Sequence, residues 1–353
     1  MAQIIPFFSP AARQSRSAAH TALIGSFAAH RRTQEDVFWL KENAELLNIL
    51  ECTGANVAAE ALAPLQGFYD GAARHISFFR QYYRFILSIC LDLEDLGMPG
   101  DTGAQLADWV QAEGLARAEL SDLQRAEARR LLARREICLR DDGLDDRLRA
   151  FISRPETFAI PNKKAAYELT HIVFYLSEYG RRDPQLPQAA LTSLEFAGLV
   201  AFLDQNADLL AEICIALRYG GQRPPAAWEA WLDRQVSAFT LSEGESSRLH
   251  DSYHEYFVTN WLMILSGRSA FRQAVPAGGV RVSAVQGGSI LKSLSEAVFD
   301  AGMARSGWGS VKVRAEAMLN EEEHGLLCVA ERSCAGFAHF FEGFARAGSA
   351  GAA

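Results

Sequence analysis

The amino-acid sequence predicts an all-α fold of helix-pair repeats, arranged as an α/α toroid or a short α-solenoid. Three observations favour this class. Helical periodicity of apolar residues dominates from about residue 33 to residue 267. Within that stretch, apolar helical segments recur and end in glycine. The intervals between these glycines leave room for a second helix in each unit, which is typical of helical repeats.

Six glycines end the recurring segments, at Gly54, Gly97, Gly143, Gly180, Gly220 and Gly267. The intervals between them are 43, 46, 37, 40 and 47 residues. Glycine is the usual residue just past a helix end, because it adopts the left-handed conformation without steric cost. Candidate second helices cover residues 56–70, 104–113, 190–204 and 225–239. A helical chain without repeats also has glycines between its helices, so that alternative stays open.

The third repeat unit is the least regular. Residues 115–154 hold ten Arg and eight Asp or Glu. Such a composition is typical of a solvated helix whose opposite charges lie four residues apart. We therefore expect a charged, exposed helix in this unit.

The sequence divides into four parts. We expect residues 1–30 to form an N-terminal arm, poorly ordered to residue 18, followed by a first helix. Residues 31–270 are expected to form the repeat domain. Residues 271–346 predict a C-terminal helical segment, with a short strand or β-hairpin within 275–290 and helices over 291–304 and about 318–346. We expect residues 347–353 to be a disordered tail.

Composition excludes several classes of protein. The chain has 353 residues, of which 49% are hydrophobic, so a globally disordered chain is excluded. A net charge of −8 argues against general nucleic-acid binding, which needs a basic face. Its six cysteines show no zinc or thioredoxin spacing and predict free thiols in a reducing compartment. Neither a signal peptide nor a long apolar run occurs, so we expect a cytoplasmic protein without membrane contact.

The densest group of polar residues on an apolar helix lies in KKAAYELTHIVFYLSEYG, residues 163–180. Glu168 and His171 share a helix face, and Tyr175 follows one turn later. Glu-x-x-His is the spacing of di-iron carboxylate bundles, which need a second pair and two more carboxylates. The other near match, around His324, is too acidic to supply that pair. We therefore interpret His171 as a candidate general base or metal ligand, with Glu168 beside it.

A second polar group lies in the segment LHDSYHEYF. His250 and His254 are four residues apart, which suits a metal pair or two ordinary surface histidines. Tyr253 and Glu255 flank His254. We expect His254 and Tyr253 to be catalytic, and Glu255 to contact ligand.

Four of the six repeat units carry a carboxylate twelve residues before the final glycine. These are Glu42, Glu168, Asp208 and Glu255. If equivalent helices line a ring, the carboxylates gather at one mouth, where Asp208 and Glu255 would contact a ligand together with Tyr175. Helix dipoles favour acidic residues in a first turn whatever the function, so both explanations stay open.

The segments KKAAYELTHIVFYLSEYG, ADLLAEICIALRYGG and DSYHEYF resemble those of uncharacterised bacterial all-helical proteins. More distantly, their layout resembles the α/α toroids of terpenoid cyclases, protein prenyltransferases and lanthionine synthetases. The resemblance covers about residues 160–267 and implies a toroid. The DxDD and DDxxD acidic motifs and the Cys-His pair of those families are missing, so their activities are not implied.

Two functions fit the sequence. The first is an enzyme or small-molecule-binding protein with a His/carboxylate site in the cavity of a helical toroid. Its catalytic residues would be His171, Glu168, His254 and Tyr253, and its ligand contacts Asp208, Glu255 and Tyr175. The alternative is a non-catalytic repeat scaffold that binds a protein or peptide through an acidic concave face. No motif identifies a metal or cofactor.

Overall fold

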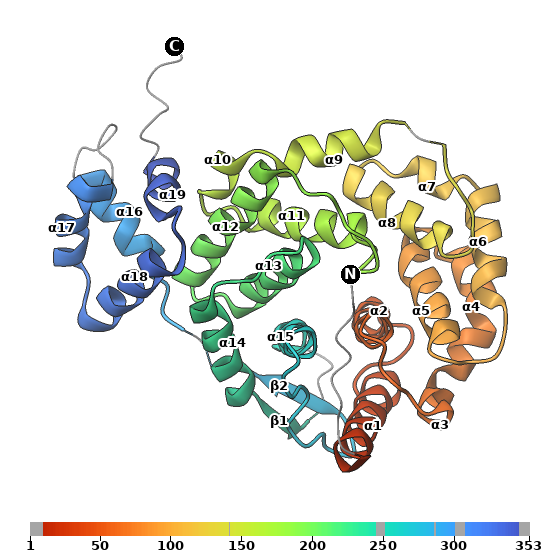
Figure 1. The fold of residues 1–353 in the computed structure, drawn as a ribbon. Helices are drawn as coiled ribbons and strands as arrows, with labels where there is room; N and C mark the ends of the chain where they lie inside the picture. Colours follow the sequence, from red (N-terminus) through yellow and green to blue (C-terminus); the bar gives the residue numbers. More distant parts are fainter. Residues whose placement is uncertain (1–9, 141, 245–250, 286, 301–307, 346–353) are drawn as a thin grey trace. The chain divides into compact units, whose positions relative to one another are not determined.

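A computed structural model describes residues 10–140, 142–244, 251–285, 287–300 and 308–345. These residues are mostly helical, with one two-stranded antiparallel sheet (Figure 1). The chain forms two compact units. Unit 1 consists of Met1–Asp142 and Val236–Ala284, and unit 2 of Gly143–Gln235 and Val285–Ala353.

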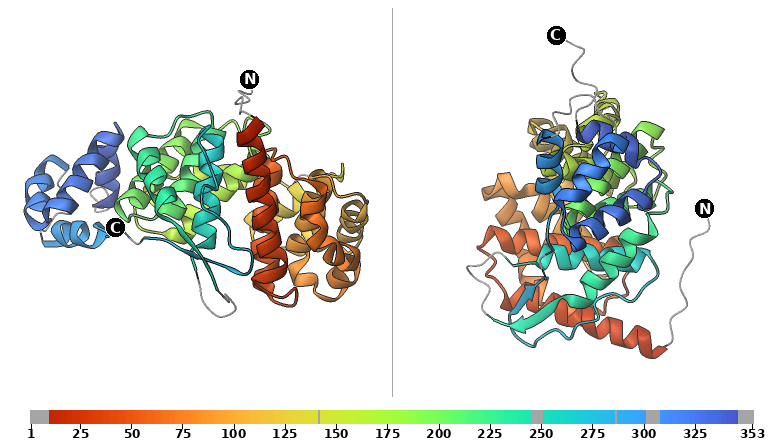
Figure 2. Two further views of the ribbon diagram at one scale, coloured as in Figure 1. Left: turned by 90° about the horizontal axis from the view of Figure 1, so that it is seen from below. Right: turned by 90° about the vertical axis from the view of Figure 1, so that its left-hand side faces the viewer.

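Unit 1 is built around helix α2 (Val37–Cys52), which packs on α5 (Tyr83–Asp95) and α15 (Tyr253–Leu265). Apolar side chains of α2 and α5, among them Trp39, Leu50 and Leu91, are fully buried between the helices. The other helices of unit 1 are α1 (Pro10–Gly25), α3 (Ala59–Leu62), α4 (Gln66–Phe78), α6 (Thr102–Ala112), α7 (Leu115–Ala118) and α8 (Asp122–Ala133). Helix α1 packs against α3 and the π-helical turn Ser26–His30 that follows it (Figure 2, left).

The sheet joins strands that are far apart in the sequence. Strand β1 (Thr240–Glu243) pairs antiparallel with β2 (Val280–Ser283), with Leu241 opposite Val282. The predicted strand in 275–290 is confirmed, but the hairpin is wrong, because the partner strand lies before α15. The strand at 240–243 interrupts a stretch predicted to be helical.

Most helices of unit 2 pack around one apolar helix. Helix α12 (Gln188–Leu203) is buried on most sides and contacts α10 (Pro155–Phe158), α13 (Ala207–Tyr219), α18 (Glu321–Ser333) and α19 (Phe337–Phe344). The remaining helices are α9 (Leu144–Ile152), α11 (Lys163–Leu176), α16 (Leu291–Asp300), α17 (Trp308–Met318) and most of α14 (Ala226–Ala238), which continues into unit 1 after Gln235. The predicted second helices at 104–113, 190–204 and 225–239 correspond to α6, α12 and α14, and that at 56–70 is split into α3, a 3₁₀ turn and α4.

The predicted glycine stops are confirmed in part. Gly54, Gly97 and Gly267 directly follow the C-cap residues of their helices with positive φ. After α11, which ends at Leu176, the first left-handed residue is Glu178, and Gly180 follows it with positive φ. At Gly180 a side chain would also overlap the ring of Tyr219, so this position requires glycine for two reasons. After α13 the left-handed residue is Gly221 instead of Gly220. Gly143 ends no helix: α8 stops at Ala133, and Gly143 is the N-cap of α9.

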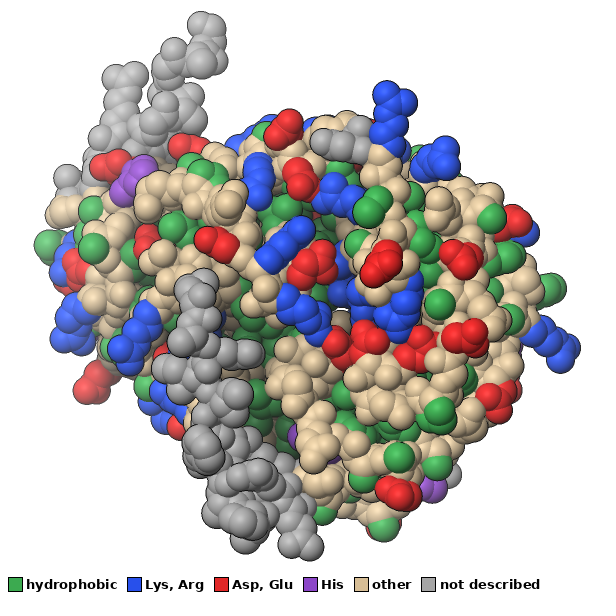
Figure 3. Space-filling model, turned by 45° about the vertical axis from the view of Figure 1, so that its right-hand side comes forward, with side chains coloured by type: hydrophobic (Ala, Val, Ile, Leu, Met, Phe, Trp, Pro, Cys, Tyr) green, Lys and Arg blue, Asp and Glu red, His purple; other side chains and the backbone are tan. Residues whose placement is uncertain are grey.

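The charged stretch 115–154 is not one helix but the three short helices α7, α8 and α9. Its arginines also pair between helices: Arg134 binds Asp92 and Asp95 of α5, each at 2.7 Å. Arg84 of α5 pairs with Glu119 and with Glu127 of α8. Acidic and basic side chains lie side by side on the face turned to the viewer in Figure 3. Charged side chains of this stretch therefore join helices, a role that the expected pairing within one helix does not include.

The two ends of the chain also differ from expectation. The N-terminal helix begins at Pro10, within the arm predicted to be poorly ordered to residue 18. The helix predicted at about 318–346 is two helices, α18 and α19, with a turn at Cys334–Gly336, and α17 precedes them. The helix predicted at 291–304 is described to Asp300. Residues 1–9 of the arm and the tail 347–353 lie outside the described residues.

None of the helices in the described part of the chain is long and apolar enough to cross a membrane.

Candidate functional site

Polar side chains join α11 and α13 inside unit 2. On α11, Tyr167, Thr170 and His171 lie three and four residues apart and share a face. The Tyr167 hydroxyl donates to Asp208 Oδ2 of α13 at 2.6 Å, and the Thr170 hydroxyl donates to Glu212 Oε2 at 2.5 Å. The two carboxylates are themselves four residues apart on α13, so two helix faces meet through matched hydrogen bonds.

Asparagine caps set where both of these helices begin. The Asn162 side chain accepts from the Ala165 backbone N–H at the start of α11, and Asn206 accepts from Leu209 N–H at the start of α13. Each cap satisfies a backbone N–H that has no partner within its helix. The caps thereby help to fix the register in which the polar residues of α11 face those of α13.

His171 is oriented by contacts to one edge of its ring. Its Nδ1 lies 2.7 Å from the backbone carbonyl oxygen of Tyr167, an acceptor, so Nδ1 carries the proton of the neutral ring. Glu212 Oε2 lies 3.6 Å from Nδ1, and the Glu212 side chain is only 2% exposed. The His171 side chain is 33% exposed. The neutral ring therefore has its lone pair on Nε2, the nitrogen opposite the Tyr167 carbonyl.

Tyr167 acts here as a hydrogen-bond donor. Burial raises the pKa of its phenol, and the negative charge of Asp208 raises that pKa further. The hydroxyl therefore stays protonated and keeps its hydrogen bond to Asp208 at neutral pH. This contact fixes α11 beside α13, and through them the position of His171.

The predicted residues of unit 2 have different surroundings. Asp208 belongs to the α11–α13 network through Tyr167. Tyr175 is 8% exposed, and its ring centroid lies 6.1 Å from that of His171. Glu168 is half-buried, and its side chain makes no hydrogen bond to the described residues. Tyr167, Thr170 and Glu212 were not predicted, although Glu212 is the one charge in the apolar run AEICIAL.

His254, a predicted residue of unit 1, contacts a carboxylate that was not predicted. Its Nδ1 lies 2.5 Å from Glu45 Oε1 of α2, and the two side chains are 32% and 16% exposed. Glu255 is half-buried in the first turn of α15. His250, the other half of the predicted histidine pair, lies outside the described residues.

Tyr253 is a buried packing residue. Burial raises the pKa of its phenol, with a further contribution from the charge of Glu45, so its hydroxyl stays protonated near neutral pH. Its ring lies beneath the Arg31 guanidinium at 5.2 Å and beside the ring of Phe257. The geometry gives Tyr253 a role in packing, while its predicted catalytic role stays a prediction.

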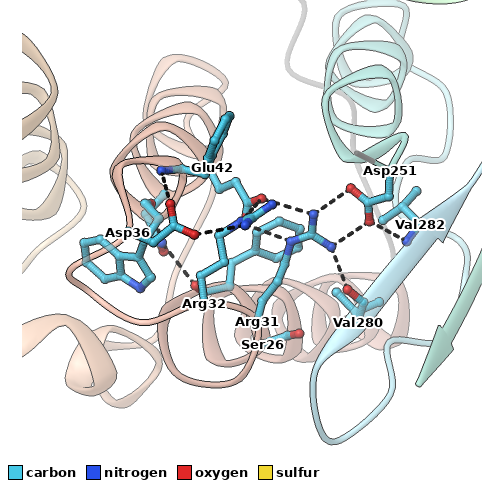
Figure 4. Close-up of polar contacts among 12 residues, drawn as sticks. Ser26, Arg31, Arg32, Asp36, Glu42, Asp251, Val280 and Val282 are labelled. Atoms are coloured by element: carbon cyan, nitrogen blue, oxygen red, sulfur yellow. Dashed lines mark hydrogen bonds and ion pairs between the residues drawn. The ribbon is translucent and has the colours of Figure 1, made fainter. Parts of the chain in front are cut away.

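Glu42 takes part in a buried ion network (Figure 4). Arg31 Nε donates to Glu42 Oε2 at 2.8 Å, and Arg32 Nε donates to Glu42 Oε1 at 2.7 Å. Arg31 also donates to both oxygens of Asp251, at 2.7 and 2.6 Å, and to the backbone carbonyl of Val280 at 2.6 Å. Glu42 and Arg31 side chains are 0% exposed. The network joins α2 to β2 and to the residues before α15.

The four carboxylates at equivalent repeat positions therefore differ in setting. Asp208 and Glu255 lie in the first turns of α13 and α15, where the helix dipole favours them. Glu42 lies further along its helix and is balanced by arginines instead. His171 and Asp208 belong to unit 2, and His254 and Glu255 to unit 1, so their convergence on one site stays a prediction.

A pocket in unit 2 lies at the start of α11 and does not include His171. Apolar side chains of α10, α12 and α13 form most of its wall. Lys163 and Asp204, 3.1 Å apart, are its charged residues. The polar network and this pocket are separate features of the same helix.

The structure thus defines a mostly helical protein with at least one histidine–carboxylate pair in each of its two units. The chain belongs to the family described as a domain of unknown function (DUF6902), whose model matches residues 1–347. Neither the search of curated proteins nor the search of solved structures found a match.

Proposed function

We propose that this chain is an enzyme or small-molecule-binding protein whose polar site centres on His171. One observation carries the proposal. The Nδ1 edge of the imidazole is held by the Tyr167 carbonyl at 2.7 Å with the buried Glu212 carboxylate behind it, while the side chain stays one-third exposed. A histidine held in this way presents Nε2 as a base or ligand, and the carboxylate stabilises the imidazolium formed when Nε2 takes a proton.

The chemistry of the site suits a small polar substrate with an O–H or N–H group. His171 Nε2 accepts that proton and returns it in a later step. Glu168, three residues earlier on α11 and half-buried, offers a second hydrogen-bond acceptor, and Tyr175 flanks the imidazole. General acid–base catalysis of this kind contributes about 10²–10⁴-fold to a rate.

The finer features expected from the sequence belong to this proposal. The helix pairs would close into an α/α toroid. The site would be completed by His254, Tyr253, Asp208 and Glu255. The protein would be cytoplasmic. The His254–Glu45 pair supports the second half of the site, because it repeats the histidine–carboxylate chemistry of His171.

The test is ligand binding with a matched control. The full chain is screened by thermal shift against a library of small polar metabolites, and hits are measured by calorimetry. We expect His171→Ala to weaken binding of a hit by at least about tenfold, because a hydrogen bond to a charged group is worth about 1.5–3 kcal/mol. Glu212→Gln should weaken binding less, because Glu212 acts through His171. His75→Ala is the control, a half-buried helical histidine in unit 1. Equal binding by wild type and His171→Ala would contradict the proposal.

Binding of a protein partner is the second candidate function. The aromatic side chains of Phe78 and Phe79, which are 79% and 42% exposed, support it. Their ring centroids lie 4.8 Å apart, so they form one exposed apolar patch at the end of α4. Exposed aromatic patches are a common feature of protein interfaces. If this function holds, Phe78→Ser with Phe79→Ser abolishes co-purification of a partner without lowering the melting temperature.

A further inference from the structure

Three metal-ligating side chains meet between α17 and α18 in unit 2, outside the α11–α13 network. His324 and Cys328 are four residues apart on α18 and lie on one face. Glu316, on α17, faces them. The capping box between Asn320 and Glu323 fixes the start of α18 just before His324.

Two of the three distances between the ligand atoms match those of a tetrahedral site. His324 Nε2 lies 3.5 Å from Glu316 Oε1 and 3.7 Å from Cys328 Sγ. One oxygen, one nitrogen and one sulfur of these residues lie within 4.8 Å of one another. Tetrahedral zinc with bonds of about 2.0–2.3 Å separates neighbouring ligand atoms by about 3.3–3.8 Å. Cys328 Sγ lies 3.7 Å from Nε2 and 3.9 Å from Nδ1 of His324, so the imidazole must rotate before its Nε2 lone pair points at an ion shared with the thiolate.

We propose that Glu316, His324 and Cys328 bind a zinc ion. Thiolate, imidazole and carboxylate are all zinc ligands, whereas magnesium and calcium require oxygen ligands. Three protein ligands leave a fourth tetrahedral position for water. The side chains of Glu316 and His324 are 27% and 44% exposed, so the ion can arrive from solvent.

Lys312, which precedes Glu316 by one turn of α17, does not hold the Glu316 carboxylate in a close ion pair. Lys312 Nζ donates to both oxygens of Glu331, at 3.0 and 2.7 Å, and Trp308 Nε1 also donates to Glu331 at 2.8 Å. The same ammonium is 4.0 Å from Glu316 Oε1. Glu331 therefore holds the lysine, and Glu316 makes only long contacts that zinc can replace.

A zinc ion would also stabilise the packing of α17 on α18. Of the described side chains on α17, Trp308 and Ala315 are buried. The Trp308 ring packs on Phe337 and Phe341 of α19, while the ion pair of Lys312 with Glu331 joins α17 to α18. A metal that bridges α17 and α18 would contribute its binding free energy to folding.

The test uses the full chain, freed of metal with a chelator, and titrated with zinc alone in competition with a chromophoric chelator. We expect one zinc per chain, and a thiolate-to-metal charge-transfer band when cobalt replaces zinc. Cys328→Ser abolishes the band, and His324→Gln and Glu316→Gln each weaken zinc binding by at least about tenfold. Circular dichroism confirms that each variant is folded.

Two variants serve as controls for adventitious binding. Cys138 is the exposed free cysteine, and His339 is an exposed histidine of α19. Zinc binding unchanged by Cys138→Ser and His339→Gln supports the proposed site. The proposal is overturned if wild type binds no zinc, if Cys328→Ser keeps the charge-transfer band, or if Cys138→Ser removes it.

Discussion

Arg31 shows how a single residue can organise unit 1. Its five N–H groups all donate, to Glu42, to Asp251 and to the Val280 carbonyl. These partners come from segments separated by more than two hundred residues. Arg31 therefore joins the N-terminal segment of unit 1 to its second segment, residues 236–284.

Loss of this arginine should strongly destabilise unit 1. Arg31→Met leaves two buried carboxylates short of a partner, and breaking a buried ion pair from one side costs about 3–5 kcal/mol. Arg31→Lys keeps the charge but not the five-donor fork, so we expect a smaller loss. Urea denaturation followed by circular dichroism measures both. A free energy of unfolding for Arg31→Met within about 1 kcal/mol of wild type would contradict this account.

At the scale of residues, polar groups on apolar helices could be found from the sequence, but their partners could not. His171, Asp208 and His254 stand out in apolar helices, and each does contact another polar side chain. Glu45 and Glu212 were not predicted as site residues, because a carboxylate on a helix is usually solvated. Only the packing of α2 on α15 and of α11 on α13 shows that these two contact histidines.

At the scale of elements, α12 and α14 approach closely at a glycine. A Cβ on Gly198 would overlap the six-membered ring of Trp228, whose side chain is fully buried. The Trp228 indole also donates to Ser333 of α18 at 3.1 Å, so the ring is held from two sides. Close contact between these helices depends on the absence of a side chain at position 198.

We therefore expect Gly198→Ala to lower the free energy of unfolding by about 1–3 kcal/mol, the usual cost of overpacking a core. Gly71→Ala in α4 is the matched control, because a Cβ there would meet no atom within 4 Å. That control should be stabilising by about 0.5–1 kcal/mol, since alanine is the better helix former. Equal melting temperatures for the two variants would show that Trp228 moves aside freely.

Elements were predicted best where one local signal sufficed. Periodicity and a terminal glycine located α2, α5, α11, α13 and α15. The signal failed at Gly143, where a glycine in the left-handed conformation begins a helix instead of ending one. It also missed β1, because a four-residue edge strand has too few residues to show a periodicity.

At the scale of the whole molecule, neither unit is a continuous piece of chain. Unit 1 needs residues 236–284 in addition to residues 1–142. The later segment supplies Asp251 and Val280 to Arg31, and Phe257 packs on Phe27 with ring centroids 4.7 Å apart. The predicted division at residues 30, 270 and 346 does not coincide with these boundaries.

A fragment of residues 1–142 should accordingly fail to fold alone, because Arg31 and Glu42 would be buried without Asp251. We expect low helicity and no cooperative thermal transition by circular dichroism. The same fragment joined through a flexible glycine–serine linker to residues 236–284 should recover both. A cooperative transition of residues 1–142 alone would show that the later segment is dispensable.

The sequence by itself determined the helical class, most helix ends, the polar character of α11 and the start of α15, and the position of β2. These are local properties, set by periodicity, capping and glycine conformation. Tertiary structure alone decided which charges are paired, that Glu42 is buried on Arg31, that His171 faces Glu212, and that Glu316, His324 and Cys328 lie together. Each of these contacts joins separate elements, and its geometry depends on helix packing that no local pattern encodes.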